Sequence, residues 1–376
     1  MDQALFAALD DLLPAASPAE ALDFLMDQFR QNRQYALLFE ATLMKRRAEL
    51  SVPLIQTEPL PEDKRVAYDE TVIAAARETG SLYLAEGNIE RAWPYFRAIG
   101  ETGPIREAIA RYTPSEEEDP EPVIDIAYQQ AVHPSKGLEL ILARFGMCRA
   151  ITVFGMYGAT AEREECIHLL VSSLYRELLE NLKAAIDRIE SSPSETASIA
   201  ELIATRDWLF GEYDYYVDTS HLTSVIQHAA DTVNPATLRM IRELCAYGRR
   251  LSVNFRIQGH PPFENIYEDY DAYAAALLGD NVEASIAHFR RKMEESDPQE
   301  TLEAQALVQL LLKLDRTREA MEVALQRLAH KSPNEIACPP AMHLCRMAGD
   351  FEALRQLARD KGDILSYAAA ALESRT

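Results

Sequence analysis

The chain has 376 residues, of which 48% are hydrophobic and 26% are charged, and its net charge is −22. This length and apolar content allow a sizeable buried core, so long disordered regions are not expected. The acidic balance repels a phosphate backbone unless a local basic face exists, and no run of basic residues occurs, so we expect no nucleic-acid partner.

Export and membrane insertion are also not expected. The N-terminus carries Asp10 and Asp11 within its first apolar stretch and lacks the basic start of a signal peptide, which predicts a cytoplasmic protein. The most apolar long segment, residues 137–159, is interrupted by Glu139, Arg144 and Arg149. Each of these charges costs about 2.5–3.5 kcal/mol at the centre of a bilayer, so the segment is interpreted as protein core.

The cysteines suggest neither disulfides nor a zinc knuckle. They are five in number, an odd count, and contain no C-x-x-C pair. Cys148 lies in an apolar run and is therefore expected to be an inert, buried thiol.

The periodicity of the sequence predicts an all-α fold. Glycine is scarce, the Asn-Gly and Asp-Gly dipeptides of tight hairpins are absent, and apolar residues recur at spacings of three and four. Residues 1–112 are expected to form an N-terminal helical-repeat domain, beginning with a helical hairpin over residues 18–47.

The sharpest repeat signal lies in the second expected hairpin. The spacing of Gly80, Tyr83, Gly87, Ala92 and Phe96 is similar to the tetratricopeptide pattern, a helix-turn-helix unit of 34 residues. The small side chains of Gly80 and Ala92 would let two antiparallel helices approach closely, with Phe96 filling the space beside them. This region therefore predicts a tetratricopeptide-like hairpin in an α-solenoid.

The rest of the chain divides into three further parts. Residues 113–122 form an acidic, proline-rich linker, and residues 123–262 do not keep the repeat period and are expected to form a central domain of irregular helices. Residues 263–376 are expected to form tetratricopeptide-like repeats, because turn signals at 279–281, 315–317 and 349–350 are about 35 residues apart.

Several segments resemble a family of uncharacterised bacterial helical-repeat proteins. They are Arg91-Ala92-Trp93-Pro94-Tyr95-Phe96, Arg206-Asp207-Trp208-Leu209-Phe210 and Asp218-Thr219-Ser220-His221-Leu222. The resemblance extends over most of the chain and implies helical repeats with tetratricopeptide-like hairpins. It implies no activity.

Two carboxylate–imidazole pairs raise the possibility of a metal site. Glu165 and His168, and likewise Asp218 and His221, are three residues apart, so each pair shares a helix face as in metal sites of helical bundles. A divalent metal could then be held by a subset of five residues: His133, His168, Glu177, Asp218 and His221. The alternative is purely structural, with Asp218 capping a helix and the histidines solvated or hydrogen-bonded in the core.

The favoured hypothesis is a protein-interaction scaffold rather than an enzyme. Stacked helical hairpins create a concave surface that commonly binds a peptide or a partner protein, and this function needs no cofactor. The tyrosine-rich stretch 213–216 could line such a groove, and residues 258–263 and 267–270 look like a second exposed loop. The binding residues proposed from the sequence are Arg206, Tyr215, Asp218 and His221.

Overall fold

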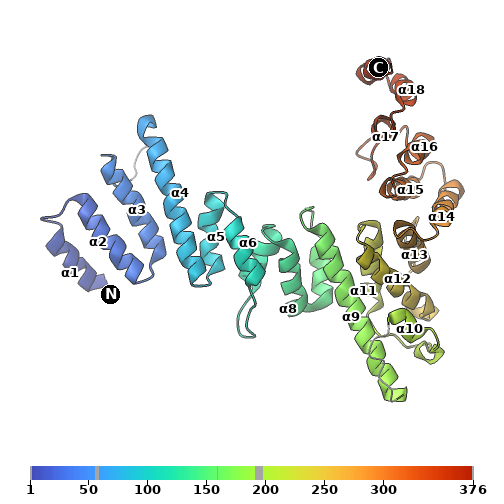
Figure 1. Ribbon diagram of the computed structural model, residues 1–376, viewed down its shortest axis with the longest axis horizontal. Helices are drawn as coiled ribbons and strands as arrows, with labels where there is room; N and C mark the ends of the chain where they lie inside the picture. Colours follow the sequence, from blue (N-terminus) through green and yellow to red (C-terminus); the bar gives the residue numbers. More distant parts are fainter. Residues whose placement is uncertain (1, 56–58, 159, 191–197, 375–376) are drawn as a thin grey trace. The chain divides into compact units, whose positions relative to one another are not determined.

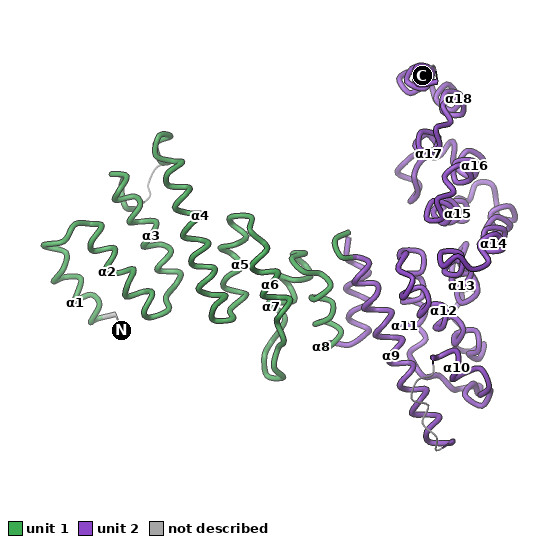
Figure 2. The backbone as a smooth tube through the Cα atoms, in the orientation of Figure 1, with its two compact units in different colours: residues 1–144, 159–162 green, residues 145–158, 163–376 purple. Residues whose placement is uncertain are grey.

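The computed structural model describes residues 2–55, 59–158, 160–190 and 198–374. These residues form helices joined by turns and loops and contain no β-strand, which confirms the all-α prediction (Figure 1). The chain divides into two compact units, shown in different colours in Figure 2. Unit 1 contains residues 1–144 and 159–162, and unit 2 contains residues 145–158 and 163–376.

Unit 1 is built from helices that pack against their neighbours in sequence, as α2 does against α3 and α3 against α4. Its elements are α1 (Asp2–Leu12), α2 (Pro18–Gln31), α3 (Tyr35–Glu49), α4 (Glu62–Ala85), α5 (Ile89–Ala98), α6 (Gly103–Arg111), α7 (Glu121–Ile124), the π-helical turn η1 (Asp125–Gln129) and the first part of α8 (Pro134–Gly155). The acidic segment 113–122 lies inside this unit.

The expected close approach of two helices occurs between α4 and α5. A Cβ atom added to Gly80 would lie 2.6 Å from Cε2 of Phe96, so it is the Phe96 ring that covers the glycine. Ala92 and Phe96 are both fully buried, and Tyr83 packs edge-on against Tyr35 with ring centroids 5.1 Å apart. The small residue at position 80 is therefore required by the aromatic ring opposite it.

Unit 2 continues with helices of uneven length and then with regular hairpins. Its elements after α8 are α9 (Arg163–Glu190), α10 (Ile199–Ile203), η2 (Asp207–Leu209), α11 (Thr219–Ile226), η3 (Gln227–Ala230), α12 (Pro235–Arg250), η4 (Val253–Phe255), α13 (Ile266–Leu277), α14 (Val282–Glu295), α15 (Leu302–Lys313), α16 (Thr317–Arg327), α17 (Ala341–Ala348), α18 (Phe351–Lys361) and α19 (Ile364–Glu373). The three predicted turns lie between α13 and α14, α15 and α16, and α17 and α18.

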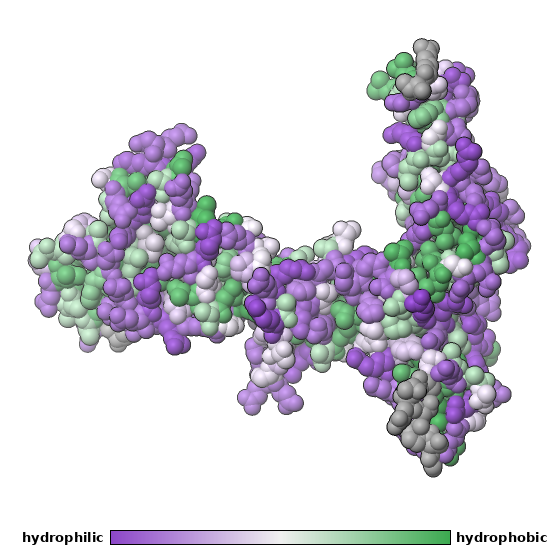
Figure 3. Space-filling model, in the orientation of Figure 1, coloured by the Kyte–Doolittle hydropathy of each residue, from purple (hydrophilic) through white to green (hydrophobic). Residues whose placement is uncertain are grey.

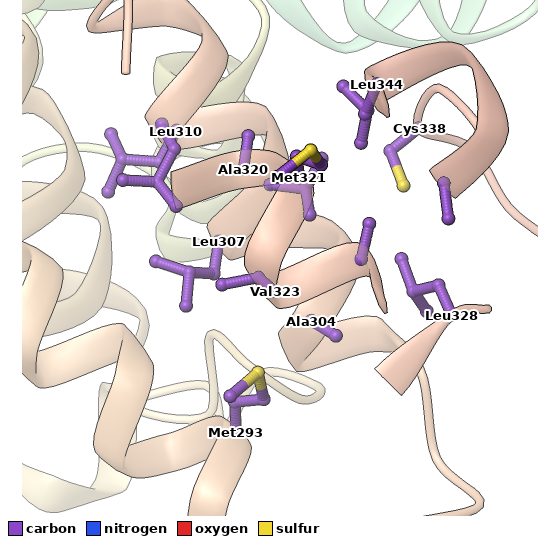
Figure 4. Close-up of a cluster of buried hydrophobic side chains, with 14 of the residues drawn as sticks. Met293, Ala304, Leu307, Leu310, Ala320, Met321, Val323, Leu328, Cys338 and Leu344 are labelled. Atoms are coloured by element: carbon purple, nitrogen blue, oxygen red, sulfur yellow. The ribbon is translucent and has the colours of Figure 1, made fainter. Parts of the chain in front are cut away.

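One apolar cluster joins these hairpins. Figure 4 shows Met293 of α14, Leu307 and Leu310 of α15, Met321 of α16 and Leu344 of α17 gathered together. Each of these side chains is at most 4% exposed. Because every hairpin contributes to its neighbour's core, none of them buries its apolar face alone.

Residues 137–158 of the most apolar segment are less buried than the sequence suggests. Gly146 interrupts α8 with φ 77° and ψ −177°, a backbone conformation that is essentially confined to glycine. Cys148, which was expected in the core, is exposed, so that prediction is wrong. Among the described residues, no helix combines the length and the apolar character that crossing a bilayer requires.

The last helix, α19, packs mainly against α18 and leaves much of its apolar surface uncovered. Ile364, Leu365 and Leu372 are between 64% and 84% exposed, and Ala370 is buried. Figure 3 shows apolar side chains at the surface of this end of the chain.

Candidate binding surface

The carboxyl end of α12 organises the region that holds most of the predicted binding residues. The helix starts after Asn234, whose side chain accepts hydrogen bonds from the amides of Ala236 and Thr237. Its apolar stripe, which includes Leu238, Ile241 and Leu244, is fully buried, and the helix packs against α9 and α13. This burial fixes the direction in which its last turn presents Arg249 and Arg250.

Arg250 holds the segment that follows α10. Its guanidinium donates to the carbonyl of Ile203 and to Asp207, and it stacks 4.4 Å from the ring centroid of Phe210. Arg206, one of the predicted binding residues, donates through Nε and Nη2 to Glu190 at 2.9 and 2.8 Å. This bidentate pair lowers the pKa of Glu190 and ties the segment to the end of α9.

The tyrosine-rich loop is fixed on its inner side and open on its outer side. The amide of Tyr216 donates to the hydroxyl of Tyr247 at 2.8 Å, and Asn181 of α9 donates to the carbonyl of Tyr216 at 2.7 Å. Tyr215 is 54% exposed and lies with its ring centroid 5.0 Å from that of Phe255. We give the name aromatic surface to the exposed or partly exposed side chains of residues 208–215 and 253–255 that follow: Trp208, Tyr213, Tyr215, Val253 and Phe255.

Asp218 and His221 have a structural place at the end of this loop. Asp218 accepts hydrogen bonds from the amide and the hydroxyl of Ser220 at 2.8 and 2.6 Å, and so caps the start of α11. These bonds lower the pKa of the Asp218 carboxyl. His221 lies in the first turn of α11 and is partly exposed. The cap is the structural alternative that the sequence had offered for this pair.

The other residues of the metal hypothesis are engaged elsewhere. His168 makes a 2.9 Å hydrogen bond with Thr237, Glu177 is exposed, and His133 lies 3.1 Å from Glu162 in unit 1. Across the described ranges, no three histidine, cysteine, aspartate or glutamate residues are grouped so that they could hold one metal ion. The metal site stays a prediction.

Two pockets lie beside the end of α12, and three of their lining residues, Gln258, Tyr267 and Glu268, belong to the stretches that the sequence had suggested as an exposed loop. The smaller, of about 180 Å³, lies between the end of α12 and the start of α13 and is lined by Arg249, Arg256, Ile257, Gln258, Glu264, Asn265, Ile266, Tyr267 and Glu268. The larger, of about 380 Å³, is lined by α12, α13 and α14. Arg249 and Glu268 line both, so we call them the Arg249 pockets.

An arginine–aspartate network forms one wall of the larger pocket. Asp271 accepts from Nε of Arg242 at 2.9 Å and from Nη1 of Arg249 at 3.0 Å. Arg242 also donates to Asp280 at 2.6 Å. Because Arg242 and Arg249 are seven residues apart, they share one face of α12, and this spacing was the signal in the sequence that could have revealed the network.

A buried carboxylate, that of Asp269, lies next to the larger pocket. Asp269 is fully buried and bonds with His288 at 2.7 Å, with Lys292 at 2.9 Å and with the amide of Asn265 at 2.9 Å. Residues 267–270 are thus part of α13. The sequence had suggested an exposed loop at this place, and that prediction is wrong. His288 also lines the larger pocket.

The cluster around His133 serves to fasten two loops of unit 1. Glu162 accepts from the hydroxyl and the amide of Ser135 at 2.6 and 2.9 Å and is paired with Arg106. The Ser135 hydroxyl also lies 3.3 Å from Nδ1 of His133, and the same nitrogen lies 3.1 Å from Glu162, so the three side chains form one hydrogen-bonded cluster.

Glu162→Gln should lower the free energy of unfolding by about 1–2 kcal/mol at neutral pH. Burial alone would raise the pKa of Glu162, but hydrogen bonds from Ser135 and Arg106 and the charge of His133 lower it to about 2. The ordinary value is 4.5, so the stabilisation is complete above that pH and is lost as the pH falls towards 2. Urea unfolding of both proteins between pH 7 and pH 2.5 measures this. A stability difference that stays constant over that range would show that the ionised carboxylate is not its source.

Comparisons with known proteins identify no relative: no family model, no curated protein and no solved structure matches the chain.

Proposed function

We propose that this protein is an interaction scaffold that binds a segment of a partner protein through the aromatic surface of unit 2. The observation that carries the proposal is the exposure of tyrosine and tryptophan on a segment that is fixed from behind. Tyr213 is 73% exposed and Trp208 is 39% exposed, while neighbouring main-chain groups are bound by Tyr247 and Asn181. Aromatic side chains are enriched at protein interfaces and dominate their binding energy.

The fixed backbone favours binding because little order has to be imposed when a partner arrives. Tyrosine loses little conformational entropy in an interface and offers an apolar ring with a polar tip. Glu190 accepts hydrogen bonds from Arg206, and Arg206 and Trp208 both lower the pKa of Glu190, so one carboxylate interacts with two residues of this segment. Arg206 and Tyr215 therefore stay among the binding residues that we propose.

The hairpins α13–α14, α15–α16 and α17–α18 support the same function. Their turns recur at about the 34-residue length of tetratricopeptide repeats, and we propose that they are repeats of this kind. Such arrays hold a binding segment in place on a rigid, extended core.

Affinity capture from the cells that make this protein tests the proposal. Tagged full-length protein is compared with the Tyr213→Ser/Tyr215→Ser variant, and we expect the variant to retain a specific partner at least tenfold less. Phe6→Ser/Val66→Ser is the matched control, because both side chains are at least 65% exposed but lie in unit 1. Equal capture by all three proteins would refute the assignment of the surface, and thermal unfolding shows whether the variants are folded.

A further inference from the structure

The Arg249 pockets contain hydrogen-bond donors that the protein itself does not use. Nη1 of Arg249 donates to the carbonyl of Tyr267 at 3.2 Å and to Asp271 at 3.0 Å. Nε and Nη2 of Arg256 donate to the carbonyls of Leu251 and Arg249 at 2.8 and 2.5 Å. A guanidinium has five N–H donors, so each arginine keeps donors that make no hydrogen bond to any residue described.

One residue that lines the smaller pocket has a buried hydroxyl without a hydrogen-bond partner. Tyr267 lines this pocket, is 5% exposed, and its hydroxyl has no hydrogen-bond partner among the described residues. Its ring packs closely against Gly248 of α12, where an added Cβ atom would lie 2.2 Å from Cε1 of the tyrosine. A buried polar group without a partner is costly, and a ligand that reached it would remove that cost.

The charges that line the pockets are balanced. Glu264 is bound by Lys292 at 2.5 Å, and Asp271 is shared by two arginines. Glu268 is exposed and lines both pockets next to Arg249. A uniformly acidic ligand would therefore be repelled by Glu268, and a uniformly basic ligand would be repelled by the arginines.

We propose that the Arg249 pockets bind a partner segment in which an acidic and a basic side chain lie close together. The carboxylate binds the open donors of Arg249 and Arg256, and the ammonium or guanidinium group binds Glu268. The amide side chains of Gln258 and Asn265, in the smaller pocket, are available to the main chain of the segment. The hydroxyl of Tyr267 supplies a further hydrogen bond to the segment.

This assignment rests on the proposed scaffold function and extends it. Ile257 lines the smaller pocket only two residues after Phe255 of the aromatic surface, and Arg249 lies in the same helical turn as Arg250, which holds the segment before that surface. One extended segment can therefore place an apolar side chain on the aromatic surface and its charged side chains in the pockets.

Fluorescence anisotropy with three labelled, end-capped peptides tests the charge requirement on the full-length protein. One contains repeats of Thr-Glu-Thr-Lys, which place acidic and basic groups on one side of an extended chain, and the others replace every Lys by Glu or every Glu by Lys. At physiological salt we expect the mixed peptide to bind at least tenfold more tightly than either other peptide. Equal or tighter binding of the all-acidic or all-basic peptide, or no binding of the mixed peptide, would overturn the proposal.

Two pairs of variants locate the binding. Tyr267→Phe should lower the affinity for the mixed peptide about three- to tenfold. Tyr273→Phe removes another buried hydroxyl without a partner, and because Tyr273 lines neither pocket, this variant should bind the peptide with native affinity. Arg249→Gln should lower the affinity for the mixed peptide tenfold or more. Arg239→Gln, on the exposed face of the same helix, should leave that affinity unchanged. If the variants of each pair behave alike, the peptide binds elsewhere and the assignment is wrong.

The capture experiment separates this assignment from the function on which it rests. If Arg249→Gln and Tyr267→Phe retain the partner as well as the native protein, while the Tyr213→Ser/Tyr215→Ser variant loses it, the scaffold function stands and the pocket assignment falls.

Discussion

Replacing Asp269 by alanine is expected to lower the free energy of unfolding of unit 2 by about 3–5 kcal/mol. The carboxylate is fully buried and is bonded to His288, to Lys292 and to the amide of Asn265. Burial would lower the pKa of Lys292, but Glu264 and Asp269 together raise it, so the lysine is held in its charged form. Removal of Asp269 leaves this ammonium, whose side chain is 16% exposed, with one carboxylate instead of two.

Urea unfolding followed by circular dichroism measures the loss. The matched control is Asp280→Ala, because Asp280 is 57% exposed and bonds to the partly exposed Arg242. Surface pairs of this kind contribute up to about 1 kcal/mol, so the control should be close to native stability. A loss below about 1 kcal/mol for Asp269→Ala would mean that Lys292 and His288 find other partners or water when the carboxylate is absent.

Replacing Gly248 by leucine is expected to cost about 3 kcal/mol, because the new side chain would occupy the space of the Tyr267 ring. A Cβ atom at this position would already lie 2.2 and 2.3 Å from Cε1 and Cδ1 of that ring, and Tyr267 is itself buried. Leucine favours a helix over glycine by somewhat less than 1 kcal/mol, which offsets only part of the clash.

Thermal unfolding distinguishes this clash from a general effect of glycine replacement. Gly155→Leu is the control, since a Cβ atom there meets no atom within 4 Å. The control should be neutral or slightly stabilising, whereas Gly248→Leu should lower the midpoint by several degrees. Equal midpoints for the two variants would show that Tyr267 can move aside at little cost.

The all-α fold and several turns could be predicted from the sequence because they depend on local patterns. Apolar spacing of three and four residues gave the helices, and the turns at 279–281, 315–317 and 349–350 separate the helices that flank them. The cap at Asp218 was likewise available as a structural alternative, because an acidic side chain just before a helix suffices to satisfy an amide of its first turn.

The Arg249 pockets as a whole could not be found in this way, because their residues come from three helices and from the loop between α12 and α13. Asp269 lies among tyrosines in Tyr267-Glu268-Asp269-Tyr270, a composition that looks exposed, and its burial depends on Lys292 and His288 about 20 residues later. Cys148 shows a second limit. Gly146 interrupts α8, so the helical phase counted before it does not continue after it, and the thiol faces outward.

The five cysteines of unit 2 differ in how readily a thiol reagent can reach them. Cys148 is exposed, whereas the other four are buried, and burial raises the pKa of the thiols of Cys338 and Cys345 to about 11. Since the thiolate is the reactive form, labelling of the native chain is confined to Cys148. A label that appears later on another cysteine reports when the part of unit 2 around it unfolds. Cys166 reports on α9, Cys245 reports on α12, and Cys338 and Cys345 report on the hairpin around α17.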